Sequence, residues 1–428
     1  MSAASAAATE SPTSASALQD EVRSWLAENW DPSLPLGEWW ARLADAGWSF
    51  PHFPIEWSGR GLSSADASIV EHEIRAAGAY GPPHGIATMM VAPMVLELGT
   101  EEQKAKWLPG IVRGTDVWCQ LFSEPGAGSD LAGVSTRAVL DGDEWIVNGQ
   151  KVWTSGGHYA KRAILVARTD PAQPKHRGLS FFVIEMDQPG VEVRPLVQMT
   201  GDAEFNEVFL TDAVVPAESL IGDVGGGWSV ALRTLSYERG SLDPEAEAGI
   251  QFALDHDEPA GRYASGELND GTRGFMPTGS EAWRLLCQLA AETGSVDDPL
   301  IRQELARLYG WFEIARFTGL RAAATQAATG QLPGPEVSLG KLASVRLMRA
   351  YRDLALTMLG PAGTLLGPDA PHGGLFAQIA LSVPGMSIAG GTDEIQRNII
   401  GERVLGLPGD IRVDKDRPFS AVASGTTS

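Results

Sequence analysis

Two neighbouring stretches contain residue types suited to binding a ligand through backbone, hydroxyl and aromatic contacts. The first reads Ser-Glu-Pro-Gly-Ala-Gly-Ser-Asp over residues 123–130, and its proline and glycines predict a loop that a ligand can approach closely. The hydroxyls of Ser123 and Ser129 stand beside free N–H groups in this loop. The second reads Lys-Val-Trp-Thr-Ser over residues 151–155 and adds the flat face of Trp153. Taken alone, each stretch is as typical of a purely structural role as of ligand binding. The first is then an ordinary surface loop, and the second is a strand that carries a core tryptophan.

Together the two stretches resemble the flavin-binding signature of the acyl-CoA dehydrogenases, and the resemblance extends from about Ala17 to Pro408. It implies FAD-dependent α,β-dehydrogenation of an acyl-CoA thioester, with electrons leaving through an electron-transfer flavoprotein. It also implies that Trp153 and Ser155 cover the flavin edge near N5. The cofactor-binding residues that it implies in these two stretches are Phe122, Ser123, Ser129, Trp153, Thr154 and Ser155.

The reaction needs one carboxylate beside the thioester α-carbon and hydrogen-bond donors for the thioester oxygen. In the family this carboxylate occupies one of two positions. The commoner position, just before a Gly-Thr pair near the C-terminus, is Gly390 here and holds no carboxylate. The other lies on the first long helix after the β domain and corresponds to Leu-Ser-Tyr-Glu-Arg over residues 235–239. The resemblance therefore implies Glu238 as the base, although a lone helical glutamate is usually a solvated charge.

The resemblance also assigns roles around Gly390 and the last helix. Gly390 leaves room for Glu238, and its N–H is suited to face the thioester oxygen. The implied substrate-binding residues are Ser129, Arg239, Gly390 and Gly391. Thr392 is a predicted N-cap of a helix whose free N–H groups face anions, and Thr392 and Glu394 are implied contacts of FAD. The alternative is a plain amphipathic terminal helix.

Two family features that reach the FAD of a neighbouring subunit are altered. The sequence contains no Arg-x-x-Phe-Gly run. Where the family carries Gln-x-x-Gly-Gly, this chain has Thr357 and Pro361, which replace the Gln amide and a backbone donor. The resemblance thus implies a dimer or tetramer, with an α2β2 assembly containing a related subunit as one form.

The elements that must position these residues are mixed α and β, in an acyl-CoA dehydrogenase-like order. We expect an N-terminal helical domain over 17–116, with Thr100 and Gln103 forming a capping box. A central antiparallel β domain follows over 117–225, in which Asn148-Gly149 predicts a hairpin turn. A C-terminal helical bundle covers 226–410 and contains an irregular loop or lid near 250–280. Residues 1–16 and 411–428 are predicted tails.

Composition excludes several classes of function. The net charge of −21 over 428 residues, without a basic cluster, argues against nucleic-acid binding and against adsorption to an anionic membrane. No apolar run reaches the length of a membrane span. Two cysteines without ligand spacing predict neither a metal site nor a disulfide scaffold. The Ala/Ser/Thr-rich start does not resemble a signal peptide, which favours a cytoplasmic location.

Two other functions remain open from the residues themselves. The same fold can carry a flavin oxidase, because a fold does not determine a reaction. The chain is also compatible with a non-catalytic subunit that completes the site of another chain. The presence of Glu238 argues against this second alternative.

Overall fold

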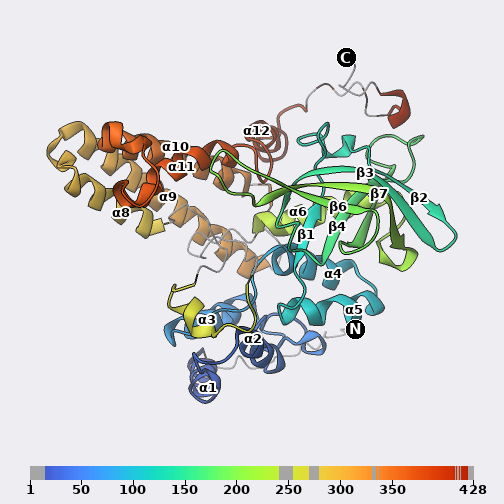
Figure 1. Ribbon diagram of the computed structural model, residues 1–428, viewed down its shortest axis with the longest axis horizontal. Coiled ribbons are helices and arrows are strands. Elements are labelled where there is room, and N and C mark those ends of the chain that lie inside the picture. The colour runs from blue at the N-terminus through green and yellow to red at the C-terminus, as the bar shows by residue number, and fades with distance from the viewer. Residues whose placement is uncertain are drawn as a thin grey trace, which may run out of the picture. The chain divides into compact units, whose positions relative to one another are not determined.

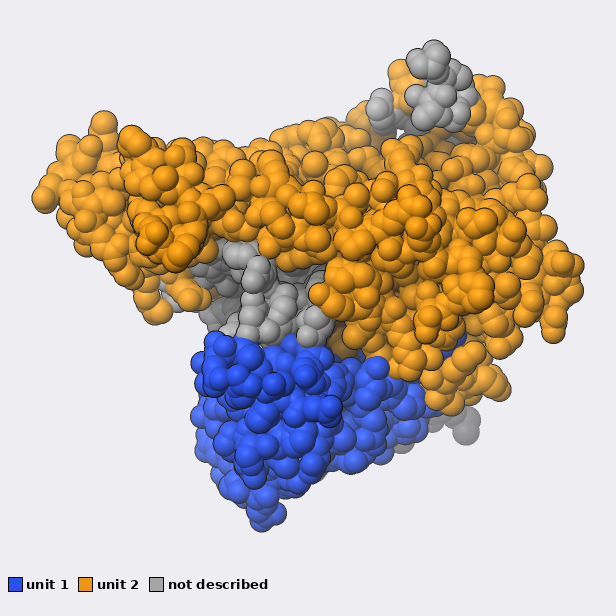
Figure 2. Space-filling view, viewed as in Figure 1, with its two compact units in different colours: residues 1–83, 107–115, 253–270 blue, residues 84–106, 116–252, 271–428 orange. Residues whose placement is uncertain are grey.

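A computed structural model describes residues 15–240, 254–268, 279–329, 334–335, 337–409, 411, 414 and 416–422. The chain divides into two compact units (Figure 2). The first comprises residues 1–83, 107–115 and 253–270, and the second comprises residues 84–106, 116–252 and 271–428. The predicted mixture of helical and β parts is confirmed.

The first unit is helical and packs around tryptophans. Its helices are α1 (Ala15–Asn29), α2 (Leu36–Asp45), α3 (Ser64–Ala76), the end of α5 (Glu101–Val112) and α7 (Ala260–Ala264). Trp39 and Trp48 are buried, and the Trp39 indole donates to the Tyr80 carbonyl over 2.7 Å. Burying such large rings provides much of the apolar area that stabilises a small helical unit.

The stretch near residues 250–280 was predicted to be an irregular loop or lid. Residues 254–268 contain α7, and Ala260 and Tyr263 are buried in the tryptophan core of the first unit. The backbone N–H groups of Leu36 and Gly37 donate to Glu258 and His256 over 2.8 and 2.9 Å. The described part of this stretch is therefore a packed segment. The rest of the predicted loop lies outside the described residues.

The second unit contains a mainly antiparallel sheet in the order β6-β7-β3-β2-β4-β5-β8, with β1 pairing parallel to β4 (Figure 1). The strands are β1 (Trp118–Leu121), β2 (Arg137–Asp141), β3 (Glu144–Ser155), β4 (Arg162–Arg168), β5 (Leu179–Glu185), β6 (Val191–Leu196), β7 (Phe205–Pro216) and β8 (Leu220–Ile221). Alternate side chains of β3 and β7 are buried, as expected for a sheet with one face on the core. β4 and β5 are buried almost throughout.

The hairpin predicted at Asn148-Gly149 is wrong. β3 runs without interruption through both residues. The hairpin turn instead lies between β2 and β3, where Asp141 pairs with Glu144 and Gly142 has φ +65°. Asn148 instead exchanges two hydrogen bonds with Asp212 across a register shift in the β3–β7 ladder. A Cβ at Gly149 would lie 2.3 Å from Thr136 Oγ1. Glycine is needed there because of this close contact.

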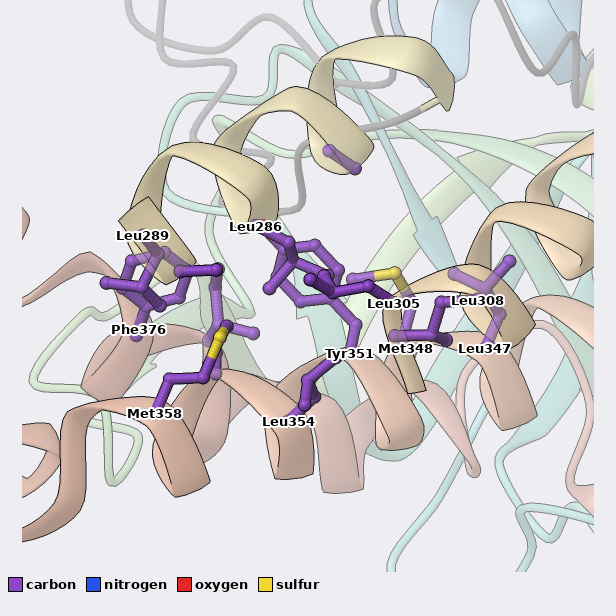
Figure 3. Packing of buried hydrophobic residues seen from close by; sticks show 14 of the residues in the cluster. Leu286, Leu289, Leu305, Leu308, Leu347, Met348, Tyr351, Leu354, Met358 and Phe376 are labelled. Atoms are coloured by element: carbon purple, nitrogen blue, oxygen red, sulfur yellow. The ribbon is translucent and has the colours of Figure 1, made fainter. Parts of the chain in front are cut away.

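The helical bundle of the second unit has one continuous apolar core. The helices that form this core are α8 (Gly279–Glu292), α9 (Pro299–Thr329), α10 (Val337–Leu359) and α11 (Leu375–Met386). The second unit also contains α6 (Gly227–Gly240) and α12 (Asp393–Ile399). Leucines of α8 and α9 point toward Tyr351, Leu354 and Met358 of α10 (Figure 3). Among the described residues, no helix combines the length and apolar character needed to cross a membrane.

Candidate functional site

The loop over residues 123–130 follows β1 and closes on itself. Glu124 and Ala127 exchange two backbone hydrogen bonds of 3.0 Å, which makes a tight turn around Pro125 and Gly126. Phe122 is buried against Phe181, with ring centroids 5.7 Å apart. The Val152 N–H donates to the Ser123 carbonyl over 2.9 Å. This bond joins the two stretches that the sequence marks as candidates.

A buried ion pair holds the start of this loop. The side chain of Lys151 is fully buried, and its ammonium group lies 2.9 Å from Glu124 Oε1. The same group donates to the carbonyls of Phe122 and Val166 over 3.0 and 2.8 Å. Glu124 also accepts from the Ser135 and Thr136 backbone N–H groups. Because each buried polar atom of the pair has partners, the desolvation cost is offset.

The pKa values of Glu124 and Lys151 depend on burial and on the opposite charge of the partner. Burial tends to raise the pKa of Glu124, but the Lys151 ammonium and the hydrogen bonds from Thr136 and Ser135 lower it to about 2. Burial lowers the pKa of Lys151, and the Glu124 carboxylate opposes that shift. Glu124 is therefore ionised at neutral pH. It serves as a structural anchor and not as a proton donor.

Trp153 is placed by an irregularity of the strand. It lies where the β3–β7 register shifts, and its φ of +61° is rare for a bulky residue. The side chain is 60% exposed and rests edge-on against Phe205, with centroids 5.9 Å apart. Such backbone strain is concentrated at functional sites. The indole thus offers an open flat surface beside the half-buried Ser155.

Thr154 has a different environment from the residues on either side of it. Its side chain is fully buried, its carbonyl accepts from Asn206 Nδ2 over 2.9 Å, and its hydroxyl has no partner among the described residues. The whole residue is buried, so the structure exposes no atom of Thr154 to a ligand, unlike its exposed neighbour Trp153.

The far end of the loop approaches the start of α12. Ser129 Oγ is exposed and lies 3.5 Å from Thr392 Oγ1. Thr392 is the N-cap of α12, as predicted, because its hydroxyl accepts from the Ile395 N–H over 3.2 Å. Glu394 is exposed and pairs with Arg397 at 3.2 Å. The structure therefore brings Ser129 and Thr392 together.

The turn before α12 has a backbone conformation that favours glycine. Gly390 and Gly391 have φ of +62° and +88°. Gln396 Nε2 donates to the Gly390 carbonyl over 2.8 Å, and a Cβ at Gly391 would lie 2.7 Å from that nitrogen. Asp393 is buried and pairs with Lys341 and Arg349, each at 3.2 Å. These contacts hold the turn in a single shape.

Glu238 and Arg239 lie in the last turn of α6, and their side chains are outside the part of the chain that the structure describes. The turn before them is tied to α4 (Ala92–Leu98). Glu97 accepts two hydrogen bonds from Arg233 Nε, at 3.0 and 2.8 Å, and one from the Tyr237 hydroxyl. This cluster fixes the position of the helix that carries Glu238.

Sequence reasoning missed the residues that act between distant elements. Lys151 and Glu124, one from each candidate stretch, form a buried ion pair. The available signal was a lysine at an inward position of an alternating strand. The contact of Glu97 with α6 joins residues more than 100 positions apart. A local sequence pattern does not predict such a long-range contact.

Two features of the helical bundle bear on the predicted contacts with a neighbouring chain. Thr357 is exposed, and its hydroxyl donates to the Asp353 carbonyl over 2.7 Å within α10. Pro361 lies in the 3-10 turn Gly360–Thr364. On α9, the apolar side chains of Ile314, Phe317 and Leu320 are 61%, 59% and 56% exposed. They follow a spacing of three residues, so they form a stripe on one side of the helix.

Comparisons with known proteins match one family in successive parts of the chain. The acyl-CoA dehydrogenase N-terminal, middle and C-terminal domain models match residues 13–115, 119–213 and 280–405. The chain is 38% identical over 411 residues to acyl-CoA dehydrogenase IpdE1 of Mycobacterium tuberculosis (strain ATCC 25618 / H37Rv), covering 91% of this chain and 96% of that relative. It is 36% identical to acyl-CoA dehydrogenase FadE34 of the same organism, covering 91% of this chain and 49% of that relative.

Solved structures agree with this comparison. The Tcur3481-Tcur3483 steroid ACAD is similar with a TM-score of 0.69 and 27% identity, over 94% of this chain and 99% of that chain. The ChsE4-ChsE5 complex from Mycobacterium tuberculosis is similar with a TM-score of 0.69 and 28% identity, over 95% of this chain and 100% of that chain.

Proposed function

Because the chain belongs to the acyl-CoA dehydrogenase family, whose members are FAD-dependent oxidoreductases, we propose that it binds FAD against Trp153 and the loop over 123–130 and oxidises an acyl-CoA thioester. The observation that carries the cofactor site is the exposed indole of Trp153 on a strained backbone. A flat ring system fits such a surface, since aromatic planes stack over a large area.

The polar residues nearby fit the same cofactor. Ser123 and Ser155 are half-buried beside the indole stretch, and Ser129 and Thr392 offer adjacent hydroxyls. The glycines of the loop leave open space above the backbone, because a Cβ at Gly126 or Gly128 would meet nothing within 4 Å. When bound, FAD supplies the acceptor for the β-hydride. The protein binds and orients the thioester beside it.

Glu238 is the proposed base. It removes the α-proton, and its carboxylate becomes a carboxylic acid while the β-hydrogen leaves with its electron pair. Gly390 stands where the commoner family position has a carboxylate, and Gly390 and Gly391 form a turn with positive φ at this point. The cluster of Glu97, Arg233 and Tyr237 holds α6 so that the base is positioned before substrate binds.

We further propose that the protein works as a heteromer with a related dehydrogenase chain. Thr357 uses its hydroxyl within α10, and Pro361 has no N–H, so neither is equipped to bind a neighbour's FAD. The stripe of Ile314, Phe317 and Leu320 is an apolar surface of the kind that partners cover. Similarity to the Tcur3481-Tcur3483 and ChsE4-ChsE5 structures supports a two-chain assembly and a steroid-derived acyl group. An electron-transfer flavoprotein is the proposed acceptor.

The test is anaerobic reduction of the purified protein, co-expressed with a related chain, by steroid side-chain and straight-chain acyl-CoA thioesters. We expect the flavin absorbance to bleach with one class of thioester and to recover slowly in air. Fast recovery in air identifies an oxidase. Protein that binds no FAD alone or with its partner contradicts the proposal.

A further inference from the structure

Residues 414 and 416–422 lie against the loop between β4 and β5 of the same unit. The N–H groups of Phe419 and Ser420 donate to the carbonyls of Gln173 and Pro171, each over 2.9 Å. Pro418 forms an isolated bridge with Pro174. These contacts join residues 418–420 to residues 171–174. Figure 1 draws this segment in dark red beside the sheet.

The segment covers a buried arginine. Arg168 is 2% exposed, and its guanidinium donates to the carbonyls of Ala132, Val134 and Lys175 over 2.7, 3.0 and 3.1 Å. The Phe419 ring lies over the guanidinium, 3.5 Å from Cζ to the ring centroid. Burial lowers the pKa of Arg168 to about 10, so it stays charged at neutral pH. Phe419 therefore shields a cation that holds residues 132–134 in place.

The segment also pairs with the lysine that holds Asp130. Lys175 Nζ lies 2.9 Å from Asp130 Oδ2 and 2.7 Å from Asp414 Oδ2. The two carboxylates raise the pKa of Lys175 against the effect of burial. Asp130 ends the loop over 123–130. The loop thus has two anchors, Lys151 at Glu124 and Lys175 at Asp130, with the exposed Ser129 between them.

We propose that residues 414 and 416–422 form a strap that keeps the Asp130 end of this loop in its binding shape, with Lys175, Arg168 and Phe419 as positioning residues. The inference rests on the proposed FAD site. Its physical basis is preorganisation, because a loop that is already ordered loses less entropy when a ligand binds. Through Lys175, the described residues of the strap are connected to the Asp130 end of the loop, so loosening the strap should leave the Lys151–Glu124 anchor intact.

The first readout needs no cofactor. In Phe419→Ala, hydrogen exchange of the flavin-free protein, prepared with its partner chain, should become about tenfold faster at residues 128–134, and exchange at residues 118–124 should not change. Phe419→Trp should restore the slow exchange because it keeps an aromatic face on Arg168, whereas Phe419→Leu should not. Asp414→Asn should act in the same direction, and Asp416→Asn, the same change at an exposed position two residues away, should not.

The second readout is FAD affinity. Phe419→Ala should weaken FAD binding about three- to tenfold with little change in the melting temperature of the flavin-free protein. Wild-type exchange and wild-type FAD affinity in Phe419→Ala and Asp414→Asn overturn the strap while leaving the proposed function intact. If the wild-type protein binds no FAD, the proposed site fails, and the exchange readout still decides whether the strap orders the loop.

Discussion

The ammonium group of Lys151 and the carboxylate of Glu124 form a buried ion pair, 2.9 Å apart, that joins the two candidate stretches of the site. Lys151 lies on β3 beside Trp153, and Glu124 lies at the start of the loop over 123–130. The pair therefore sets the spacing between the exposed indole and the loop. Two further hydrogen bonds of the Lys151 ammonium group, to the Phe122 and Val166 carbonyls, connect the pair to the residue that follows β1 and to β4.

Removing Lys151 should destabilise the protein strongly. Lys151→Met leaves the Glu124 carboxylate buried without its cation, which costs about 3–5 kcal/mol in the free energy of unfolding. Lys161→Met is the matched control, because Lys161 is largely exposed and pairs with Asp116, and it should cost less than about 1 kcal/mol. Denaturant unfolding measures both. An equal loss of unfolding free energy in the two variants would show that the buried Lys151–Glu124 pair stabilises the fold no more than an exposed pair does.

The same pair predicts how stability depends on pH. The pKa of Glu124 is about 2 in the folded protein and 4.5 ordinarily, so the folded state favours the ionised form. The resulting stabilisation is complete above pH 4.5 and is lost as the pH falls from 4.5 toward 2. The difference in unfolding free energy between wild type and Glu124→Gln should therefore shrink over this range. A difference that grows as the pH falls contradicts the assignment.

Trp153 should matter for the cofactor and little for stability. Trp153→Gly relieves the strain of a positive φ and loses the contact with Phe205, and these effects nearly cancel, so the unfolding free energy should change by less than about 1 kcal/mol. FAD affinity should fall about tenfold or more, because the stacking of the FAD ring system on the indole is lost. Trp153→Phe keeps an aromatic ring and should lose less affinity. Unchanged FAD affinity in Trp153→Gly would remove this residue from the site.

The cluster at Glu97 should affect turnover more than binding. Arg233→Met breaks the bond that ties α6 to α4, so the base on α6 loses its fixed position. We expect kcat to fall about tenfold with FAD affinity unchanged. Arg194→Met removes an exposed pair with Glu192 and should leave kcat unchanged. A lower FAD affinity with normal kcat would show that the cluster serves another purpose.

The sequence predicts the local elements well and the long-range contacts poorly. The capping box of Thr100 and Gln103 is confirmed by bonds of 3.0 and 3.3 Å, and the N-cap of Thr392 is confirmed as well. These devices act within four residues, so a single sequence contains the whole signal. The order of helical, β and helical parts is also confirmed.

The prediction failed where a residue's role depends on a distant partner. Asn148-Gly149 has the composition of a turn, but Asp212 and Thr136 determine its conformation. The packing of residues 254–268 beside α2 depends on contacts with Leu36 and Gly37, more than 200 positions earlier. The buried pair of Lys151 and Glu124 is likewise formed only by the folded sheet. The roles given to Glu238 and to the flavin-binding residues stay predictions.

The central claim is that Glu238 removes the α-proton. Glu238→Gln keeps the size of the side chain and removes the proton acceptor at neutral pH. Flavin reduction by the acyl-CoA, followed anaerobically by stopped flow, should slow by about 10²–10⁴, equivalent to roughly 3–5 kcal/mol in the barrier, while FAD binding is retained. Gly390→Glu in this background supplies a carboxylate from the commoner family position and should restore part of the rate, with the φ of +62° at this position costing the new side chain about 1–2 kcal/mol. Near-normal flavin reduction by Glu238→Gln alone would contradict the account.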